Sequence, residues 1–467
     1  MSTESIEKPR RIAFIHPDLG IGGAERLVVD AAIGLQKLGN EITIYTSHCD
    51  YQHCFDEISS GKLKVVVFGD WLPTNFYKRF HILFAILRQL YLTIMLIITG
   101  SISGFDFFIV DQLSFCIPLL NFFSEPRARV LFYCHFPDQL LTKRLSLFKK
   151  LYRIPFDFIE ERTTGISDQI VVNSNFTKKI FHDTFTNLSS INPGVIYPCV
   201  DTENIEHNSE SNKEVLNFFK NSKYFLSINR FERSKNIELA IKAFAKSKKI
   251  LPGKPRLVIA GGYDARVLEN VEYLKELTTL CDNLKLTNFT IRGKLIIMPP
   301  STDVLFLPSI KTSLKNSLLQ NAEILLYTPT REHFGIVPVE SMLYKTPVLA
   351  KNFGGPLETI INYDGSNINE ATGFIETNDF EKWAKIMIKY YNETSPEIKK
   401  QLGENGYHRA VDKFSRTETS YEFVNNLEHA LRQPKRQFIH PRVISLFPLV
   451  VIVISYIIYR LKFSNWE

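Results

Sequence analysis

The stretch that decides the fold is residues 11–46, RIAFIHPDLGIGGAERLVVDAAIGLQKLGNEITIYT. A short β-branched and aromatic run, Arg11–Pro17, leads through a glycine turn into an amphipathic helical pattern, and Glu41–Thr46 has the pattern of the next strand. Because a strand, a crossover helix and a second strand form a βαβ unit, this stretch predicts a parallel sheet. Five further strands are expected in the same half of the chain: Lys64–Phe68, Phe107–Val110, Val130–Cys134, Gln169–Asn173 and Ile196–Pro198.

The same order of elements begins again at Tyr224–Ile228, which precedes the helical pattern IELAIKAFAKSKK and the strand Arg256–Ala260. Further strands are expected at Val304–Leu307, Ile324–Tyr327 and Pro347–Ala350. The sequence therefore predicts an α/β fold of two Rossmann-like, doubly wound domains with a ligand cleft between them. We expect an N-terminal domain at 1–200, a polar linker at 201–222, a second domain at 223–410 and, at 411–434, a helix that returns to the first domain.

The composition limits the partners. The 467 residues include 56 Lys and Arg against 49 Asp and Glu, a net charge of +7 that suits phosphorylated substrates, anionic lipids or nucleic acid. No RNA-binding aromatic motif, zinc finger or recognition helix is present in the sequence, so nucleic acid is not expected. The six cysteines lack the rhythm of a disulfide framework, which favours a reducing compartment. His48, Cys49, His53 and Cys54 have no second pair at zinc-site spacing, so no metal site is expected.

Two hydrophobic stretches indicate contact with a membrane. Residues 80–98 contain Arg88 and Gln89 at mid-length, which favours an interfacial helix, or one buried against the domain, over a true span. Residues 443–459, VISLFPLVVIVISYIIY, carry no charge and have basic residues on both sides. The stretch is at the short end of the length that a spanning helix needs, and Pro448 interrupts it. It nevertheless ends the chain after a polar stretch, so we expect a membrane anchor there, and the basic residues on both sides leave its orientation undecided. The N-terminus has no signal-peptide pattern, so a cytosolic start is expected.

The strongest chemical motif is PTREHFGIVPVE at 329–340, in which seven residues separate Glu332 from Glu340. The segment follows a strand and enters a helix, so the backbone N–H groups of His333–Ile336 (with Phe334 and Gly335 between them) would face a ligand rich in hydroxyls or negative charge. Two carboxylates so spaced can bind two parts of one polyol. By itself the motif fits a helix cap with a surface glutamate equally well.

A second motif, NRFERSKN at 229–236, places Arg230 and Lys235 after a strand. An arginine can grip a diphosphate with two hydrogen bonds and a lysine adds a mobile charge, so the pair could neutralise a departing nucleotide without a metal. A solvated basic turn is the alternative.

Three shorter features follow other strands. GIGGAER at 20–26 lets the backbone approach a ligand at Gly22 and Gly23, and its spacing differs from the G-x-G-x-x-G fingerprint of nicotinamide cofactors. His135 in YCHFPDQ would face the same cleft, although a lone histidine is more often structural. KNFGGP at 351–356 is a further glycine turn suited to phosphate or sugar.

Taken in order, GIGGAER, YCHFP, SINRFERSKN, TPTREHFGIVPVESM, KNFGGP and TGFIE resemble the retaining GT-B glycosyltransferases of the family 4 type, from Arg11 to about Phe414. Within that family, SINRFERSKN and YCHFPDQLL look most like the dolichyl-linked α1,3/α1,6-mannosyltransferases of early N-glycan assembly. The resemblance implies mannose transfer from GDP-mannose to a dolichyl-diphosphate oligosaccharide, on the cytosolic face of the endoplasmic reticulum membrane. It implies no cofactor or bound metal, and it suggests a complex with other lipid-linked oligosaccharide mannosyltransferases.

The resemblance also implies roles for individual residues. Arg230 and Lys235 would hold the diphosphate, Glu332 the donor mannose, and Glu340 the ribose hydroxyls, with Lys235, Glu332 and His135 as the catalytic set. The backbone at His333–Ile336 would contact sugar and phosphate. Gly22, Gly23 and His135 would lie on the acceptor or phosphate side. Two alternatives stay open: a retaining transferase of this fold with another donor or acceptor, and a non-catalytic membrane subunit, which would have no need of these four charged residues.

Overall fold

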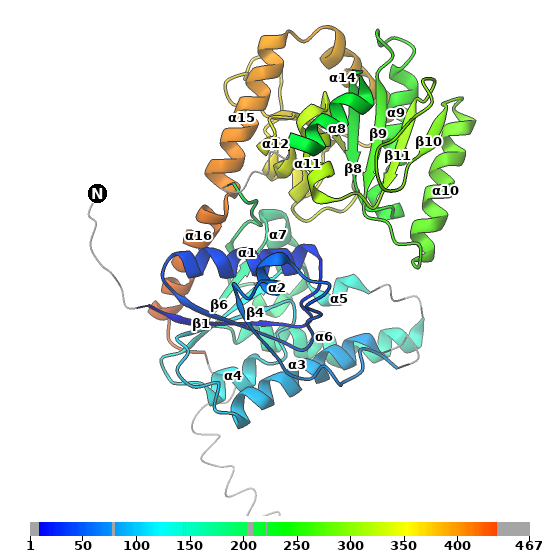
Figure 1. Cartoon of the computed structure of the whole chain (residues 1–467). Coiled ribbons are helices and arrows are strands. Elements are labelled where there is room, and N and C mark those ends of the chain that lie inside the picture. Colours follow the sequence, from blue (N-terminus) through cyan, green and yellow to red (C-terminus); the bar gives the residue numbers. More distant parts are fainter. Residues whose placement is uncertain are drawn as a thin grey trace, which may run out of the picture. The chain divides into compact units, whose positions relative to one another are not determined.

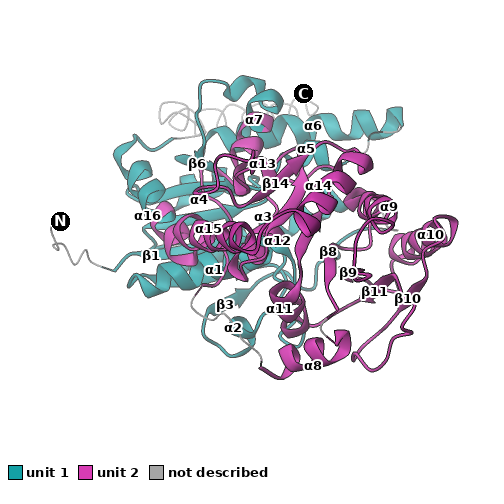
Figure 2. Cartoon of the chain, turned by 90° about the horizontal axis from the view of Figure 1, so that it is seen from above, with its two compact units in different colours: residues 1–171, 181–194, 423–467 teal, residues 172–180, 195–422 magenta. Residues whose placement is uncertain are grey.

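A computed structural model of the chain describes residues 9–76, 80–142, 144, 146–202, 209–220 and 222–436. The chain divides into two compact units (Figure 2): unit 1 comprises residues 1–171, 181–194 and 423–467, and unit 2 comprises residues 172–180 and 195–422. The main division between the units, at residues 194 and 195, lies close to the predicted domain end at residue 200. Residues 172–180 belong to unit 2 because Ser174, Asn175 and Phe176 hydrogen-bond to the backbone of His333 and the carboxylate of Glu358.

Unit 1 is built on a seven-stranded sheet of order β3-β2-β1-β4-β5-β6-β7, in which the pairs from β3 to β5 are parallel. Each predicted strand is present except the last, which forms two residues earlier as a two-residue strand. The strands are β1 (Arg11–His16), β2 (Glu41–Thr46), β3 (Lys64–Val67), β4 (Phe107–Asp111), β5 (Arg129–Cys134), β6 (Gln169–Val172) and β7 (Gly194–Val195). Strand β4 is buried along its whole length, as expected for a central strand covered on both faces.

The helices of unit 1 follow its strands, as a doubly wound sheet requires (Figure 1). They are α1 (Gly23–Lys37), α2 (Asp56–Ser59), α3 (His81–Ile98), α4 (Ile117–Phe123), α5 (Asp138–Leu141), α6 (Leu147–Gly165), α7 (Asn175–Thr184, which begins in unit 2) and the 3-10 turn η1 (Thr186–Leu188).

Unit 2 contains a second seven-stranded sheet of order β10-β11-β9-β8-β12-β13-β14, parallel throughout. Its strands are β8 (Tyr224–Ile228), β9 (Arg256–Gly261), β10 (Asn288–Thr290), β11 (Val304–Pro308), β12 (Ile324–Tyr327), β13 (Val348–Lys351) and β14 (Gly373–Glu376). The edge strands β10 and β14 were not predicted because each is short and only partly buried, so neither shows a hydrophobic run.

Alternate residues of these strands enter two apolar cores. Phe225 and Ile259 pack on one face under α9 (Glu238–Ser247), and Leu226 and Val258 pack on the other under α11 (Thr312–Asn321). The remaining helical elements of unit 2 are α8 (Ser209–Phe219), η2 (Arg233–Lys235), α10 (Leu268–Asn283), α12 (Ile336–Leu343), α13 (Pro356–Thr359), α14 (Phe380–Asn392), α15 (Pro396–Phe414) and α16 (Arg416–Arg432, which ends in unit 1).

The predicted linker at 201–222 is too long. Its second half forms α8, whose Val215 and Phe219 are buried in the core of unit 2. The polar composition hid this helix because only one narrow stripe of it faces inward. The expected anchor at 443–459 lies outside the described residues.

Among the described residues, α3 is the one helix long and apolar enough to cross a membrane by length and composition. It nevertheless packs on unit 1 through polar groups. Arg88 is buried and donates to the carbonyl of Ser47 (3.2 Å), and buried Gln89 donates to the carbonyl of Leu113 (2.6 Å). The structure thus agrees with the predicted helix that packs against the domain, and its contact with a membrane stays a prediction.

Replacing Arg88 tests this anchorage. Arg88→Ala is expected to lower the free energy of unfolding by about 2 kcal/mol, because it empties a buried site and leaves the Ser47 carbonyl without its donor. Leu87→Ala, on the exposed face of the same helix, should cost less than about 0.5 kcal/mol. Denaturant unfolding of the purified variants measures both, and equal losses would mean that α3 does not depend on its buried polar contacts.

Candidate active site

The segment that follows β12 is fixed by the loop that follows β8. The hydroxyl of Thr328 donates to the carbonyl of Lys235 (2.7 Å), and the backbone N–H and hydroxyl of Thr330 donate to the carbonyl of Ser234 (3.2 and 3.0 Å). Strands β8 and β12 are parallel neighbours, so their carboxyl ends meet at one edge of the sheet. This explains how two motifs nearly a hundred residues apart in the sequence come together.

The clearest consequence is an ion pair between Lys235 and Glu332, whose Nζ and Oε2 atoms are 3.0 Å apart. Both side chains are about one-fifth exposed, so the pair is partly shielded and still open to a ligand. A lysine amine and a carboxylate held at this distance can each turn to a different part of a charged substrate.

Tyr327, the last residue of β12, connects Glu332 with the second glutamate. Its side chain is buried, and burial, followed by the charge and hydrogen bond of Glu332 and the charge of Glu340, raises the pKa of Tyr327 well above its usual value. The phenol therefore stays neutral and can donate to Glu332. Glu340 lies on α12 and pairs with Lys315 on α11, with 2.7 Å between Nζ and Oε1. Each glutamate of the motif thus has its own lysine.

Close backbone packing holds the Glu332 segment. Gly355 donates its N–H to the carbonyl of Glu332 (2.9 Å), and a Cβ on Gly355 would lie 2.2 Å from the Cα of Phe334. Gly335 has φ +85°, in the left-handed region that favours glycine, and forms the N-cap of α12. The glycine turn predicted at 351–356 therefore supports the chain at 332–334.

His333 and Phe334 are fixed from the other side of that segment. The hydroxyl of Ser174 donates to the carbonyl of His333 (2.7 Å), and the ring of Phe176 stacks on the His333 imidazole. Phe334 is buried and packs on Tyr197. The Phe334 side chain therefore belongs to the core of unit 2, and α12 begins two residues later, at Ile336.

Arg230 follows β8 but does not join the glutamate pair. Its guanidinium forms an ion pair with Glu232 (3.1 Å) and the side chain is about two-thirds exposed. A Cβ on Gly262 would come within 3.1 Å of the Arg230 Cγ, so the glycine after β9 leaves room for the arginine stem. The structure thus brings Lys235, Glu332 and Glu340 into one cluster and leaves Arg230 beside it.

In unit 1, His135 belongs to a chain of three buried or half-buried polar groups. Asp111 ends β4 and its carboxylate contacts His16 Nδ1 (2.7 Å), at the end of β1, and His135 Nε2 (2.7 Å), after β5. Because an ionised carboxylate only accepts hydrogen bonds, the His16 Nδ1 atom that faces it carries a hydrogen. Asp111 thus lies between the two imidazole rings and fixes the His16 ring by a hydrogen bond.

The interactions among His16, Asp111 and His135 favour an ionised Asp111 carboxylate and a protonated His16 imidazole. Burial would raise the pKa of Asp111, but the charges and hydrogen bonds of His135 and His16 outweigh it and hold the pKa at about 2. Burial would also lower the pKa of His16, yet the Asp111 carboxylate, with the charge of Glu25, raises it above 6.5. The pair stabilises a cationic His16 in the interior of unit 1.

Gly22 and Gly23 lie where β1 turns into α1. Gly22 is the N-cap of α1 in an extended conformation, and a Cβ there would lie 2.2 Å from an oxygen of Glu25, whereas Gly23 has open space. The turn thus follows His16 along the chain at the same sheet edge as Asp111.

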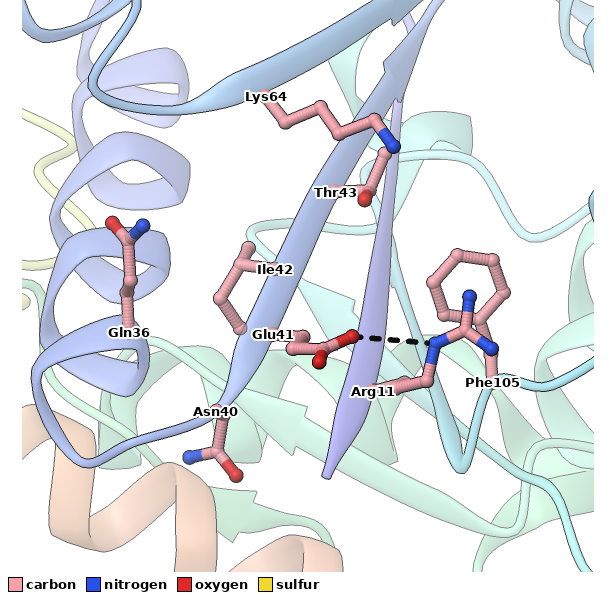
Figure 3. A pocket seen from close by; sticks show the side chains of 8 residues that line it. All are labelled: Arg11, Gln36, Asn40, Glu41, Ile42, Thr43, Lys64 and Phe105. Atoms are coloured by element: carbon pink, nitrogen blue, oxygen red, sulfur yellow. Dashed lines mark ion pairs between the residues drawn. The ribbon is translucent and has the colours of Figure 1, made fainter. Parts of the chain in front are cut away.

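One cavity of unit 1 lies at the wrong end of the sheet for this chemistry. It measures about 330 Å³ and its lining includes Arg11, Glu41 and Lys64, the first residues of β1, β2 and β3 (Figure 3). His16, Asp111 and His135 lie at the opposite, carboxyl ends of their strands, where ligands bind in such sheets. No group of three or more His, Cys, Asp or Glu side chains in the described ranges is arranged to hold a metal ion.

Sequence reasoning missed four members of these clusters. Tyr327, His16 and Asp111 each end a buried parallel strand, and the rule that polar residues at carboxyl strand ends face ligands would have found them. Lys315 carries no such signal, because it lies on a helix and meets Glu340 only through packing of α11 beside α12.

Comparison with known proteins identifies the relatives of this chain. The model "Glycosyltransferase Family 4" matches residues 21–204 and "Glycosyl transferases group 1" matches residues 208–409. The chain is 66% identical to α-1,3/1,6-mannosyltransferase ALG2 of Candida albicans, over 90% of this chain and 99% of that protein. It is 58% identical to the protein of the same name from Debaryomyces hansenii, over 99% and 100% of the two chains. It is 50% identical to that of Saccharomyces cerevisiae, over 93% and 88%.

Solved structures share the fold at low identity. A glycosyltransferase from Rickettsia africae superposes with a TM-score of 0.66 at 18% identity, covering 91% of this chain and 99% of that one. Sucrose-phosphate synthase from Thermosynechococcus elongatus gives a TM-score of 0.66 at 17% identity, over 89% and 98%. These likenesses, with the two parallel sheets, show the two-domain GT-B fold.

The variant Asp111→Asn tests whether the interaction of Asp111 with His16 makes the stability of the protein depend on pH. The raised pKa of His16 contributes stability that is fully present below pH 6.5 and is lost as the pH rises through the folded-state pKa. The Asp111 contribution is present above pH 3.8 and is lost only as the pH falls toward about 2. The variant should therefore unfold on the order of 5–10 °C lower than the parent near pH 5–6, with a smaller difference above pH 8.

Thermal unfolding across this pH range measures the difference. Asp264→Asn, which removes a carboxylate from an exposed ion pair with Arg266, is the matched control and should show little change at any pH. A difference for Asp111→Asn that stays constant from pH 5 to pH 9 would contradict the linkage to His16.

Proposed function

The chain belongs to the family of α-1,3/1,6-mannosyltransferases, and we propose that it transfers mannose from GDP-mannose to a dolichyl-diphosphate-linked Man-GlcNAc2 oligosaccharide. Two additions, α1,3 and α1,6, would give the Man3GlcNAc2 product with retention of configuration. The observation that carries the proposal is the cluster of Lys235, Glu332, Tyr327 and Glu340 at the carboxyl edge of the unit 2 sheet. It offers the charges and hydroxyl-binding groups that a nucleotide-sugar requires.

The cluster can bind the donor in stages. Without ligand, Lys235 is neutralised by Glu332. An incoming diphosphate would compete for the ammonium group, and the exposed Arg230, which forms an ion pair with Glu232, could turn to the same phosphates. Glu332 would then be left with the hydrogen bond of neutral Tyr327 and would face the donor sugar. Glu340, oriented by Lys315, would accept hydrogen bonds from the ribose hydroxyls.

The reaction breaks the bond between the mannose C1 atom and the phosphate oxygen and forms one between C1 and an acceptor hydroxyl oxygen. Positive charge develops on the sugar, and the Glu332 carboxylate stabilises it. Lys235 stabilises the negative charge on the departing diphosphate, which takes the acceptor proton on the same face of the sugar. We propose that both linkages form at this one site, because the motif PTREHFGIVPVE, which carries the two glutamates after a strand, occurs once in the sequence.

We place the acceptor side in unit 1, at His135 with Gly22 and Gly23. The Asp111 carboxylate, 2.7 Å from His135 Nε2, would hold the imidazole in place. The lipid acceptor supports a location at the endoplasmic reticulum membrane with both units in the cytosol. A complex with other mannosyltransferases of the same pathway, and catalysis without a cofactor or metal, are part of the proposal.

The direct test is transfer of radiolabelled mannose by the purified full chain to a synthetic lipid-linked Man-GlcNAc2 acceptor. Two sequential products are expected with GDP-mannose, and α-mannosidases of known linkage preference should identify α1,3 and α1,6 bonds. UDP-glucose is the competing donor. Preferential use of UDP-glucose, or the absence of either linkage, would overturn the assignment.

Lys235→Ala should reduce turnover by on the order of 10²-fold or more, because the variant lacks the preorganised positive charge that stabilises the leaving diphosphate. The matched control is Lys246→Ala, which breaks a comparable 3.0 Å ion pair with Glu381 on the exposed surface of the same unit and should leave turnover unchanged. Steady-state kinetics for each linkage measures the effect. Loss of one linkage alone would contradict a shared site.

A further inference from the structure

Helix α6 of unit 1 has its polarity inverted. Its inward side carries Arg153, Glu160, Thr163 and Thr164, all buried. Its outward side carries an apolar stripe at helical spacing, in which every residue is 57–78% exposed: Leu147, Leu151, Ile154 and Phe158. A surface helix of a soluble domain ordinarily buries its apolar stripe and exposes its polar one. The inversion needs an explanation outside unit 1.

The buried polar side chains of α6 form ion pairs and hydrogen bonds with other groups of unit 1. Arg153 forms ion pairs with Asp138 (2.7 Å) and Asp157 (3.0 Å), and Glu160 accepts the backbone N–H groups of Asp138 and Gln139 (2.7 and 3.2 Å). The hydroxyls of Thr163 and Ser114 lie 2.7 Å apart. These contacts fix the rotation of the helix, so the apolar stripe cannot turn inward without leaving buried charges unpaired.

The stripe is part of a larger apolar surface on the same unit. Tyr152 of α6 packs on Phe80, next to the start of α3, with 5.4 Å between ring centroids. Helix α3 exposes Leu87, Ile94 and Ile98, and α4, which contacts both helices, exposes Phe122 and Phe123. Figure 1 shows these three helices on one side of unit 1. We call the exposed apolar residues of α3, α4 and α6 the apolar face.

The charges beside the stripe are basic. Lys149 and Lys150 are exposed on the first turn of α6, whereas the one acid between Leu147 and Ile159, Asp157, is paired with Arg153 and Arg144. Near the other end of the stripe, the guanidinium of Arg162 covers the ring of Phe158 (5.2 Å). An apolar stripe bordered by lysines is the pattern of a helix that lies in the headgroup region of a bilayer containing anionic lipids.

The C-terminal segment leaves the described structure at the same place. Arg436 donates to the carbonyl of Gly165, the last residue of α6, and to the carboxylate of Asp168 (3.1 and 2.9 Å), while Asn121 of α4 donates to the Arg436 carbonyl. The chain continues for 31 residues from 437 to 467, and these include the uncharged stretch 443–459. The contacts therefore hold Arg436, the last described residue before that stretch, beside α4 and α6.

We propose that the apolar face docks unit 1 on an anionic lipid bilayer, with the α6 stripe inserted at the boundary between headgroups and acyl chains and Lys149 and Lys150 on the phosphates. The lipid-linked acceptor of the proposed function supports this partner, and to that extent the inference rests on that function. The inverted polarity of α6 supports it independently. Docking would present unit 1 to an acceptor whose diphosphate lies at the same boundary.

Fluorescence quenching by lipid tests the docking without catalysis. The full chain carrying Leu151→Trp, reconstituted in phosphatidylcholine–phosphatidylserine vesicles with brominated acyl chains, should lose most of the added tryptophan emission. Leu268→Trp, at an equally exposed position on α10 in unit 2, is the control and should lose little. Subtracting the unmodified chain removes the signal of the three native tryptophans. Absent or equal quenching in the two variants would overturn the proposal and favour a protein partner for the apolar face.

A second variant separates docking from chemistry. Leu151→Glu with Ile154→Glu should lower mannose transfer to a long-chain lipid acceptor in vesicles by on the order of tenfold or more, because two charges replace inserted apolar side chains. Transfer to a short-chain acceptor in detergent should change by less than about twofold, since both positions are exposed and outside the candidate active site. Equal losses in the two assays would contradict docking. If the parent transfers no mannose at all, the proposed function fails while the quenching result still decides the docking.

Discussion

Parallel strands carry their functional residues at their carboxyl ends, and this constraint governs both halves of the chain. In unit 2 it brings the loop after β8 beside the segment after β12, so that Lys235 and Glu332 form an ion pair. In unit 1 it places His16, Asp111 and His135 at the carboxyl ends of three adjacent strands. Residues far apart in the sequence meet because neighbouring strands end at one edge, whatever lies between them. The helices and glycine turns then fix the orientation of each side chain.

The two glutamates of the unit 2 cluster form ion pairs in which a ligand can replace one partner. Glu332 and Glu340 each have a lysine partner, and buried Tyr327 stays neutral between them. Partly exposed ion pairs contribute little to stability, so their value lies in holding side chains in place for a ligand that can replace one partner. The histidine chain of unit 1 differs, because Asp111 is fully buried and its two partners cannot be exchanged without leaving a charge unpaired. We interpret the lysine–glutamate pairs of unit 2 as groups that bind a ligand, and the histidine chain of unit 1 as a rigid support.

The helices on the apolar face show how one domain can serve two environments. Polar side chains of α3 and α6 hold these helices to neighbouring segments of unit 1 through hydrogen bonds and ion pairs, whereas apolar side chains on the other side of each helix are exposed. Composition alone indicated that α3 is an apolar helix, because its mean hydropathy is high. It did not reveal α6, whose charged residues balance its apolar ones along the sequence. Only the rotation of the helix on the domain distinguishes an inverted helix from an ordinary one.

The sequence alone determined the repeated βαβ order, the position of most strands and the two glutamates with Lys235, because strand periodicity and motif spacing are local properties. It also predicted His135, but as a lone residue. The tertiary structure decided that Asp111 joins His135 to His16, that Lys315 meets Glu340, that residues 172–180 belong to unit 2 and that 209–219 form a helix rather than a linker. Each of these depends on which elements pack together. Packing is set by the whole chain through the burial of apolar area and the pairing of buried charge, and no local pattern carries that information.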